Sequence, residues 1–132
     1  MAIGQKWTDA GQAYAIDLLD VNTRSGLVTT YHGTWGASAQ TPAVTDTALI
    51  SENPEARTVI GIGSQTQPAA DTMRWTYIIV ATGSRIVQET GVISTLTGVG
   101  ILHVRIVHGS LTLESGDQVT YTVNLQLKDV SE

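Results

Sequence analysis

The stretch RIVQETGVISTLTGVGILHVRIVHGSLTLESGDQVTYTVNLQLK spans Arg85 to Lys128, and its final part decides the fold. From Val119 onward, apolar and polar side chains alternate up to Lys128. Because successive side chains of a strand point to opposite faces, this pattern predicts a strand with one apolar and one polar face. A helical period of 3.6 residues would not separate the two kinds so cleanly. Residues 115–117, Ser-Gly-Asp, favour a turn before it, and the rest of the chain must supply strands that cover the apolar face.

Outward from this stretch, similar segments recur about every ten residues, with turn-forming residues between them. The expected strands are 27–35, 58–62, 72–81, 85–92, 100–107, 110–113 and 118–129. Residues 36–47 consist of small and polar side chains and are predicted to be a loop that is either functional or flexible. Residues 65–71 are predicted to be a second loop. This spacing of short strands predicts an all-β fold, a jelly-roll-like antiparallel β-sandwich.

The N-terminal region has a helical pattern instead. Thr8 or Asp9 can cap a helix, and apolar side chains then recur at the spacing of one helix face. We expect one short helix over about residues 9–20, preceded by an arm of residues 1–7. At 132 residues, the chain is predicted to form a single domain over residues 8–132.

Composition argues against several classes of protein. The charged content is only 14%, the net charge is −5, and the seven Lys and Arg residues are scattered. Nucleic-acid-binding proteins cluster these residues, so we expect no nucleic-acid partner. The apolar run from Tyr77 to Ala81 is too short to span a bilayer, and the first residues do not resemble a secretory signal. Cysteine is absent, which excludes disulfides and thiolate metal sites.

The residue types that bind metals or perform catalysis do not form a recognisable constellation. His32, His103 and His108 are not spaced for chelation, and no cysteine completes a set. His103 beside Arg105 is interpreted as part of a polar outer face available to an interface. No nucleophile elbow or phosphate-binding loop is present. We therefore predict a protein that is not an enzyme and has no cofactor or metal site.

Glu89 and the tryptophans each have two interpretations. Glu89 either accepts backbone N–H groups, or an arginine of a neighbouring subunit, or is a solvated strand residue, and the last interpretation is favoured. Trp35 and Trp75 fall on the apolar faces of predicted strands, so core packing is favoured over stacking on sugars. Trp7 precedes the helix and would either staple it or insert into a partner.

Several segments, taken in order, resemble a group of small tailed-bacteriophage virion proteins that are described as short tail-fibre proteins or as head decoration (cement) proteins. The segments are TDAGQAYAIDLL near the N-terminus, Tyr31 to Trp35, PAVTDTAL at Pro42 to Leu49, QETGV at Gln88 to Val92, and LESGD at Leu113 to Asp117 before an alternating strand. They are spread over most of the chain, and their order and spacing carry the resemblance. It implies a jelly-roll-like β-sandwich built into a virus particle, in the head or in the tail.

The expected function is that of a capsid decoration or cement protein, made in the host cytoplasm and located on the capsid surface of the virion. It would bridge neighbouring major capsid subunits through flat, Thr-rich, weakly charged faces and flexible arms, and would form a dimer or trimer. The alternatives are a tail-fibre or adsorption module that binds host glycans, and a structural joint in the neck or tail. Partner contacts are expected in residues 2–7, 37–47 and 65–71. The candidate partner-binding residues are Lys6, Trp7, Gln40, Thr41, Pro42, Gln65, Gln67, His103 and Arg105.

Overall fold

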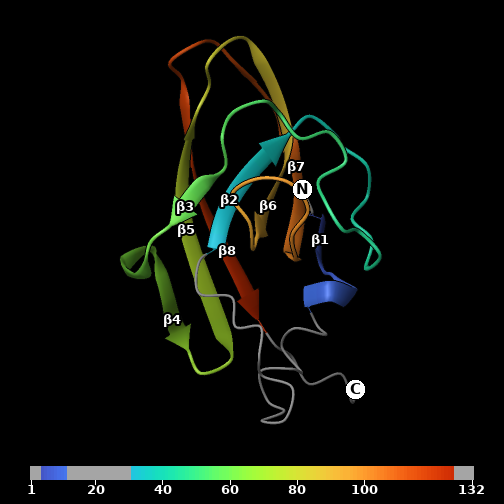
Figure 1. Cartoon of the computed structure of the whole chain (residues 1–132), viewed down its shortest axis with the longest axis vertical. Coiled ribbons are helices and arrows are strands. Elements are labelled where there is room, and N and C mark those ends of the chain that lie inside the picture. Colours follow the sequence, from blue (N-terminus) through green and yellow to red (C-terminus); the bar gives the residue numbers. More distant parts are fainter. Residues whose placement is uncertain (1–3, 12–30, 127–132) are drawn as a thin grey trace.

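The computed structural model describes residues 4–11 and 31–126, which form an all-β sandwich of two antiparallel sheets (Figure 1). The strands are β1 (Gly4–Trp7), β2 (Tyr31–Gly36), β3 (Thr58–Ile60), β4 (Gln65–Ala69), β5 (Thr72–Val80), β6 (Arg85–Ile93), β7 (Leu102–Leu113) and β8 (Gln118–Gln126), with a 3₁₀ helix, η1 (Ile62–Ser64), after β3. Sheet A has the order β1-β7-β6-β2-β3, and sheet B has the order β4-β5-β8. The prediction of an all-β sandwich is confirmed. Within the described ranges, no helix is long and apolar enough to cross a membrane.

The two sheets are offset from each other. In sheet A, the strands that β5 approaches most closely are β3 and β2. Sheet B therefore lies toward the β3 edge of sheet A, while β7 and β1 extend on the opposite side of the sandwich (Figure 1). β8 is the edge strand of sheet B on that side. Consistent with the offset, Ile106 and His108 of β7 are only half-buried.

In the strands predicted at 72–81 and 118–129, alternate residues form the inner and the outer side of sheet B. β5 and β8 pair along their whole length without a shift in register. Trp35 of sheet A and Trp75 of sheet B are buried, which confirms their prediction as core residues. Burying one large apolar side chain contributes roughly 1.5–3 kcal/mol, so this layer holds the sheets together. The buried core consists of Trp35, Ile60, Trp75, Tyr77, Ile79, Ala81, Val87, Val92, Val104 and Val123.

Tyr77 packs directly against the backbone of β2 at Gly33. A Cβ atom at Gly33 would lie 2.2 Å from Cδ2 of the Tyr77 ring, so a larger residue does not fit without movement. The Thr90 hydroxyl donates to the carbonyl oxygen of Thr34 (2.7 Å), and the Tyr77 hydroxyl donates to Thr90 Oγ1 (2.6 Å). Burial raises the pKa of Tyr77 well above its ordinary value, so the hydroxyl stays a donor. This polar chain links the two sheets inside the core.

The N-terminal residues differ in part from the prediction. Residues 4–7, expected within a separate arm, form the edge strand β1 and pair antiparallel with β7. Pairing satisfies backbone groups that would otherwise be left open along the edge of β7. The predicted helix is confirmed at its start, because residues 9–11 are helical and Thr8 Oγ1 accepts the N–H of Gly11 at 3.0 Å. Residues 12–20 of that helix lie outside the described ranges.

Two further predictions, one of a loop and one of two separate strands, need correction. Residues 65–71 are not a loop, because Gln65–Ala69 forms the edge strand β4, whose pairing with β5 is irregular. Its polar composition and Pro68 are compatible with an edge position. The predicted strands 100–107 and 110–113 are a single strand, β7, in which residues 108–110 bulge relative to β6. The predicted strand residues 27–30 and 127–129 lie outside the described ranges.

Candidate partner-binding surface

Glu89 lies in β6 and is completely buried, with 0% of its surface exposed. Its carboxylate accepts the backbone N–H groups of Ser38 (3.0 Å), Ile50 (2.9 Å) and Ser51 (3.0 Å). It also accepts the Nε–H of Arg105 on β7 (3.0 Å). The favoured interpretation of Glu89 as a solvated strand residue is therefore wrong. The carboxylate does accept backbone N–H groups, and the arginine that it binds belongs to the same chain.

Arg105 extends this network toward the connection between β2 and β3. Arg105 is also completely buried, and its Nη1 donates to Asp46 Oδ2 at 3.2 Å. Asp46 in turn accepts the N–H of Ala43 (2.9 Å). Residues 37–57 are thereby fastened over the face of sheet A that is turned away from sheet B. Because an unpaired buried charge costs several kcal/mol, the two carboxylates and the guanidinium depend on one another.

A second set of hydrogen bonds, formed by Glu52 and Arg57, holds the connection 37–57 in place. The Nε of Arg57 donates to Glu52 (2.8 Å), and its Nη1 donates to the carbonyl oxygens of Thr95 and Gly98 in the β6–β7 loop (both 3.0 Å). Glu52 also accepts the hydroxyl of Thr34 in β2 (2.5 Å). The hydrogen bond from Arg57 lowers the pKa of Glu52, and the bond from Thr34 adds to this effect against the opposing effect of burial.

A third set of hydrogen bonds, accepted by Glu55, holds the same connection. It accepts the indole N–H of Trp35 (3.1 Å), the backbone N–H and hydroxyl of Thr82 (3.1 Å each), and the Nε–H of Arg85 (2.7 Å). Burial alone would raise the pKa of Glu55, but the hydrogen bonds from Thr82 and Trp35 bring it below its ordinary value. Glu52, Glu55 and Glu89 therefore give the connection 37–57 a defined course, which does not support the prediction of a flexible arm there.

His103 and Arg105 lie on opposite faces of β7, which corrects the prediction of a shared polar outer face. The pairing of β7 with β6 shifts between Val92 and Ile93, and this bulge changes the alternation at His103. The ring centroid of His103 is 5.0 Å from that of Tyr31, which packs against the core. Burial lowers the pKa of His103 to about 4.

Four of the predicted partner-binding residues are accessible. Gln40, Thr41 and Gln67 are exposed and Gln65 is half-buried, so their role stays a prediction. Gln40 and Thr41 belong to the connection over sheet A, whereas Gln65 and Gln67 belong to β4 of sheet B. The structure therefore does not bring the predicted residues together into one site.

The remaining predicted residues are not accessible or lie outside the described side chains. Pro42, His103 and Arg105 are buried, so their prediction as partner-binding residues is wrong for this arrangement of the chain. The backbone of Lys6 and Trp7 lies in β1, whereas their side chains are outside the described part of the structure. Their predicted partner contacts stay predictions.

The outer face of sheet B is nearly uncharged. β4 forms one edge of this face, and the rest is formed by alternate residues of β5 and β8, whose pairing has no irregularity. Its one charged side chain is Arg74, whose Nε–H donates to Asn124 Oδ1 at 2.8 Å. Every β8 residue on this face is exposed. The residues, which we call the threonine face, are Thr72, Arg74, Thr76, Ile78, Val80, Gln118, Thr120, Thr122, Asn124 and Gln126.

The threonine face is chemically suited to contact another protein. The core of a protein–protein interface is depleted of charged residues relative to the rest of the surface. Burying hydroxyl and amide groups also costs less than burying ions. Sequence reasoning expected Thr-rich faces in general but did not assign these residues to a partner. The sequence does indicate this face, because it is formed by the residues that alternate with the apolar ones in the segments 72–81 and 118–128.

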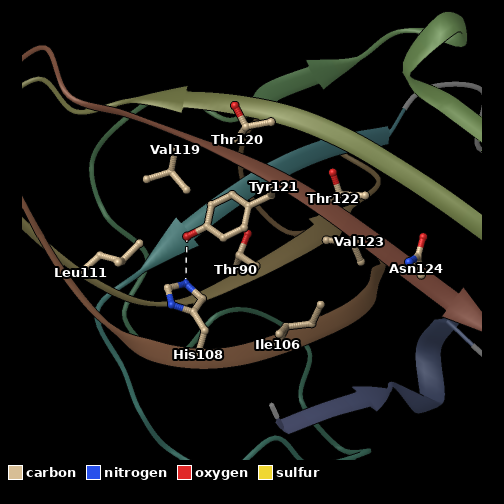
Figure 2. A pocket seen from close by; sticks show the side chains of 10 residues that line it. All are labelled: Thr90, Ile106, His108, Leu111, Val119, Thr120, Tyr121, Thr122, Val123 and Asn124. Carbon is tan, nitrogen blue, oxygen red and sulfur yellow. Dashed lines mark hydrogen bonds between the residues drawn. The ribbon is translucent and has the colours of Figure 1, made fainter. Parts of the chain in front are cut away.

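A cleft of about 370 Å³ opens beside β8, between the two sheets (Figure 2). Tyr121 points toward His108 across it, and the Tyr121 hydroxyl lies 2.9 Å from His108 Nε2. His108 Nδ1 donates to the carbonyl oxygen of Gly109 (2.7 Å), which leaves Nε2 free to accept from Tyr121. Burial raises the pKa of Tyr121, which keeps its hydroxyl protonated. The cleft is lined by Thr90, Ile106, His108, Leu111, Val119, Thr120, Tyr121, Thr122, Val123 and Asn124.

The chemistry of this cleft is that of a binding surface. Its lining residues include no Asp, Glu, Lys or Arg, so they offer apolar contact and uncharged hydrogen-bonding groups. Across residues 4–11 and 31–126, no group of three or more His, Asp or Glu residues is placed to hold a metal ion. An apolar side chain or a short extended segment fits the character of the lining better than an ion does.

Neither the protein-family models nor the curated proteins with which the chain was compared match it. The family to which the chain belongs is therefore not shown. Its function has to be inferred from the residues, the geometry and the sequence resemblance described above.

Proposed function

We propose that the chain is a structural protein of a tailed-bacteriophage particle that decorates the capsid and holds neighbouring major capsid subunits together. The observation that carries the proposal is the threonine face, an uninterrupted two-stranded surface whose one charged residue is Arg74. The sequence resemblance supports a role in a virus particle. The threonine face supports contact with another protein as the way in which the chain acts there. A jelly-roll-like arrangement and association into a dimer or trimer belong to the same proposal.

The size of the threonine face indicates how it would act. Two strands of nine residues cover an area about 30 Å long and about 10 Å wide. That is roughly 300 Å², well below the roughly 800 Å² that each partner buries in a stable interface. One face alone would therefore bind weakly. Copies that contact several subunits at once would bind far more strongly, because each further contact is made within the same assembly.

The fastened connection complements this mode of binding. Glu52, Glu55 and Glu89 fix the other side of the molecule through hydrogen bonds to backbone and side-chain groups. A surface that is already ordered loses little conformational entropy when it binds. The sandwich would therefore act as a stiff spacer rather than as a segment that folds on its partner.

The glycan-binding alternative receives no support from the buried tryptophans. Trp35 and Trp75 are in the core and cannot stack on a sugar ring. Among the side chains that the structure describes, no aromatic platform stands out on the surface. A structural joint in the neck or tail would use the same kind of contact face, and the test below separates it from capsid decoration.

Quantitative mass spectrometry of purified particles tests the proposal. A decoration protein is present in hundreds of copies because it follows the repeated subunits of the shell, whereas a neck or tail protein is present in a handful. Hundreds of copies would support the proposal. A handful would favour the joint or the tail fibre, and absence from the particle would contradict a virion role altogether.

A further inference from the structure

Sheet B ends at β8, and the outer edge of β8 has no partner strand among the described residues. Such an edge presents a row of unpaired backbone N–H and C=O groups. Natural proteins usually protect edge strands by keeping them short, or by adding proline, charged side chains or bulges. The presence or absence of these features shows which edges are open to pairing.

The other three edges of the two sheets are protected and β8 is not. β1 has four residues and β3 has three, so both are short. β4 contains Pro68 and pairs irregularly with β5. β8 has nine residues, QVTYTVNLQ, with no proline, glycine or charged side chain, and it pairs with β5 without a bulge. It is the long, regular, uncharged edge of the described structure.

The cleft lies directly along this edge. Residues 119–124 of β8 all line it, and Ile106 and Leu111 of β7 line its other side (Figure 2). Because the sheets are offset, β7 and β1 extend beyond β8 and would lie beneath a strand added to its edge (Figure 1). Inward side chains of such a strand would enter the cleft, as those of β5 enter the core.

The lining defines the chemistry of the strand that would fit. A charged side chain in the cleft would lose hydration and find no counterion, since no Asp, Glu, Lys or Arg lines it. Inward positions must therefore be apolar. Outward positions would lie beside Thr120 and Thr122 on the threonine face, where uncharged polar residues match their neighbours.

A single extended segment fits this place better than a second copy of the whole sandwich. Two copies paired antiparallel through β8 about a two-fold axis would each carry β7 and β1 beyond the shared edge. Both overhangs would then occupy the same space beneath the joined sheets. A segment without a second layer has no such overhang.

We propose that β8 binds an extended, uncharged segment of another protein, which becomes a fourth strand of sheet B and places alternate apolar side chains in the cleft. Main-chain hydrogen bonds would supply the affinity, and the cleft would select the alternate side chains. This binding does not depend on the proposed role in a virus particle and can be measured on the purified protein.

The test uses a synthetic peptide, QVTYTVNLQ with capped ends, which is uncharged and alternates apolar residues. The control peptide, QKTYTKNLQ, has the same length but carries lysine at two inward positions. Backbone hydrogen exchange is followed by NMR on the isotope-labelled full chain. At saturation with the first peptide, we expect exchange to slow at least about ten-fold at every second amide of β8, those not paired with β5, and to stay unchanged in β4. The control peptide should have no effect.

Two matched variants separate the cleft from the outer face. Leu111→Lys places an ammonium group at the cleft, and Thr112→Lys places one at the neighbouring position; both residues are exposed, so both variants should fold. Peptide binding should weaken at least about ten-fold in Leu111→Lys, the factor that corresponds to a free-energy difference of 1.4 kcal/mol, and stay unchanged in Thr112→Lys.

Three results would overturn the proposal. One is the absence of any peptide effect at millimolar concentration, and another is equal binding by the two variants. The third is protection of the edge amides of β8 in the free protein that rises with protein concentration together with a doubling of mass. That result would make a second copy the occupant of the edge.

Discussion

The two outer faces of the sandwich are built on opposite principles. The outer face of sheet A is covered by residues 37–57, which Glu52, Glu55 and Glu89 hold through hydrogen bonds and ion pairs. On the outer face of sheet B, β5 and β8 form the threonine face, whose β8 residues are all exposed and whose one charged side chain is Arg74. Only 14% of the residues are charged, and several of them form hydrogen bonds and ion pairs within the chain.

The two faces differ because only the irregular part of the chain needs specific polar contacts. The irregular connection has no ladder of strand hydrogen bonds, so its backbone N–H groups need acceptors such as Glu89. The regular strands β5 and β8 pair with each other along their whole length, so the backbone groups between them need no side-chain acceptor, and the outer side chains of β8 are all exposed.

Glu89→Gln should have the largest effect on stability. The substitution leaves the buried Arg105 without its fully buried countercharge and weakens the acceptor for three backbone N–H groups, so we expect a loss of about 3–5 kcal/mol in the free energy of unfolding. Denaturant unfolding measures it. Glu114→Gln, at an exposed glutamate, is the control and should change stability by less than about 0.5 kcal/mol. Equal effects of the two substitutions would show that the network does not fasten the connection.

Acidification should weaken the fold through His103. Its pKa is about 4 in the folded chain, against an ordinary value of 6.5. Between pH 4 and pH 6.5 the unfolded chain binds more protons than the folded chain does. The contribution of neutral His103 to the free energy of unfolding is therefore complete above pH 6.5. It is lost as the pH drops toward 4, by up to about 3 kcal/mol. Glu52 and Glu55, whose pKa values are lowered, add to the loss only below about 4.5. Unfolding curves at pH 7 and pH 5 should differ in the native chain and nearly coincide in His103→Phe; an unchanged difference would exclude His103 as its source.

Gly33→Ala should destabilise the core by about 1–3 kcal/mol, the usual range for overpacking. The added Cβ would overlap the Tyr77 ring. Gly63→Ala is the control, because no atom lies within 4 Å of a Cβ at that position. Thermal unfolding compares the two. A Gly33→Ala protein as stable as Gly63→Ala would show that Tyr77 does not pack against β2 as described.

Thr76→Lys and Thr122→Lys should have the smallest effect on stability, under about 0.5 kcal/mol each. The two residues lie opposite each other on the threonine face. Under the proposed function, each lysine should nevertheless lower occupancy on the particle, because an ammonium group would be buried without a partner. Thr112→Lys, on an exposed part of β7, is the control. Occupancy measured by mass spectrometry that is the same for all three variants would show that the threonine face is not the contact.

Much of the fold could be predicted because it follows a local pattern. Alternation over 72–81 and 118–128 identifies β5 and β8 and also their inner and outer sides. The same kind of alternation placed Trp35 and Trp75 on the apolar sides of their strands, and both are buried in the core. The Thr-rich outer side was present in the same pattern, and it became a specific surface only when the register paired Thr76 with Thr122.

The predictions that failed depend on contacts between distant residues. Nothing near His103 in the sequence marks the bulge that moves it away from Arg105. The burial of Glu89 depends on residues 37–57 passing over it. One usable signal existed, because Glu89 and Arg105 are opposite charges in the middle of adjacent predicted strands. β4 was missed because its polar residues form a strand only by pairing with β5.

An electron cryomicroscopy map of the purified particle would show directly which face of the sandwich meets the shell. We predict that the threonine face, with Thr76 and Thr122 near its centre, lies against the capsid subunits. The connection 37–57 should face away from them. A map in which the connection contacts the shell and the threonine face is turned to solvent would contradict this prediction.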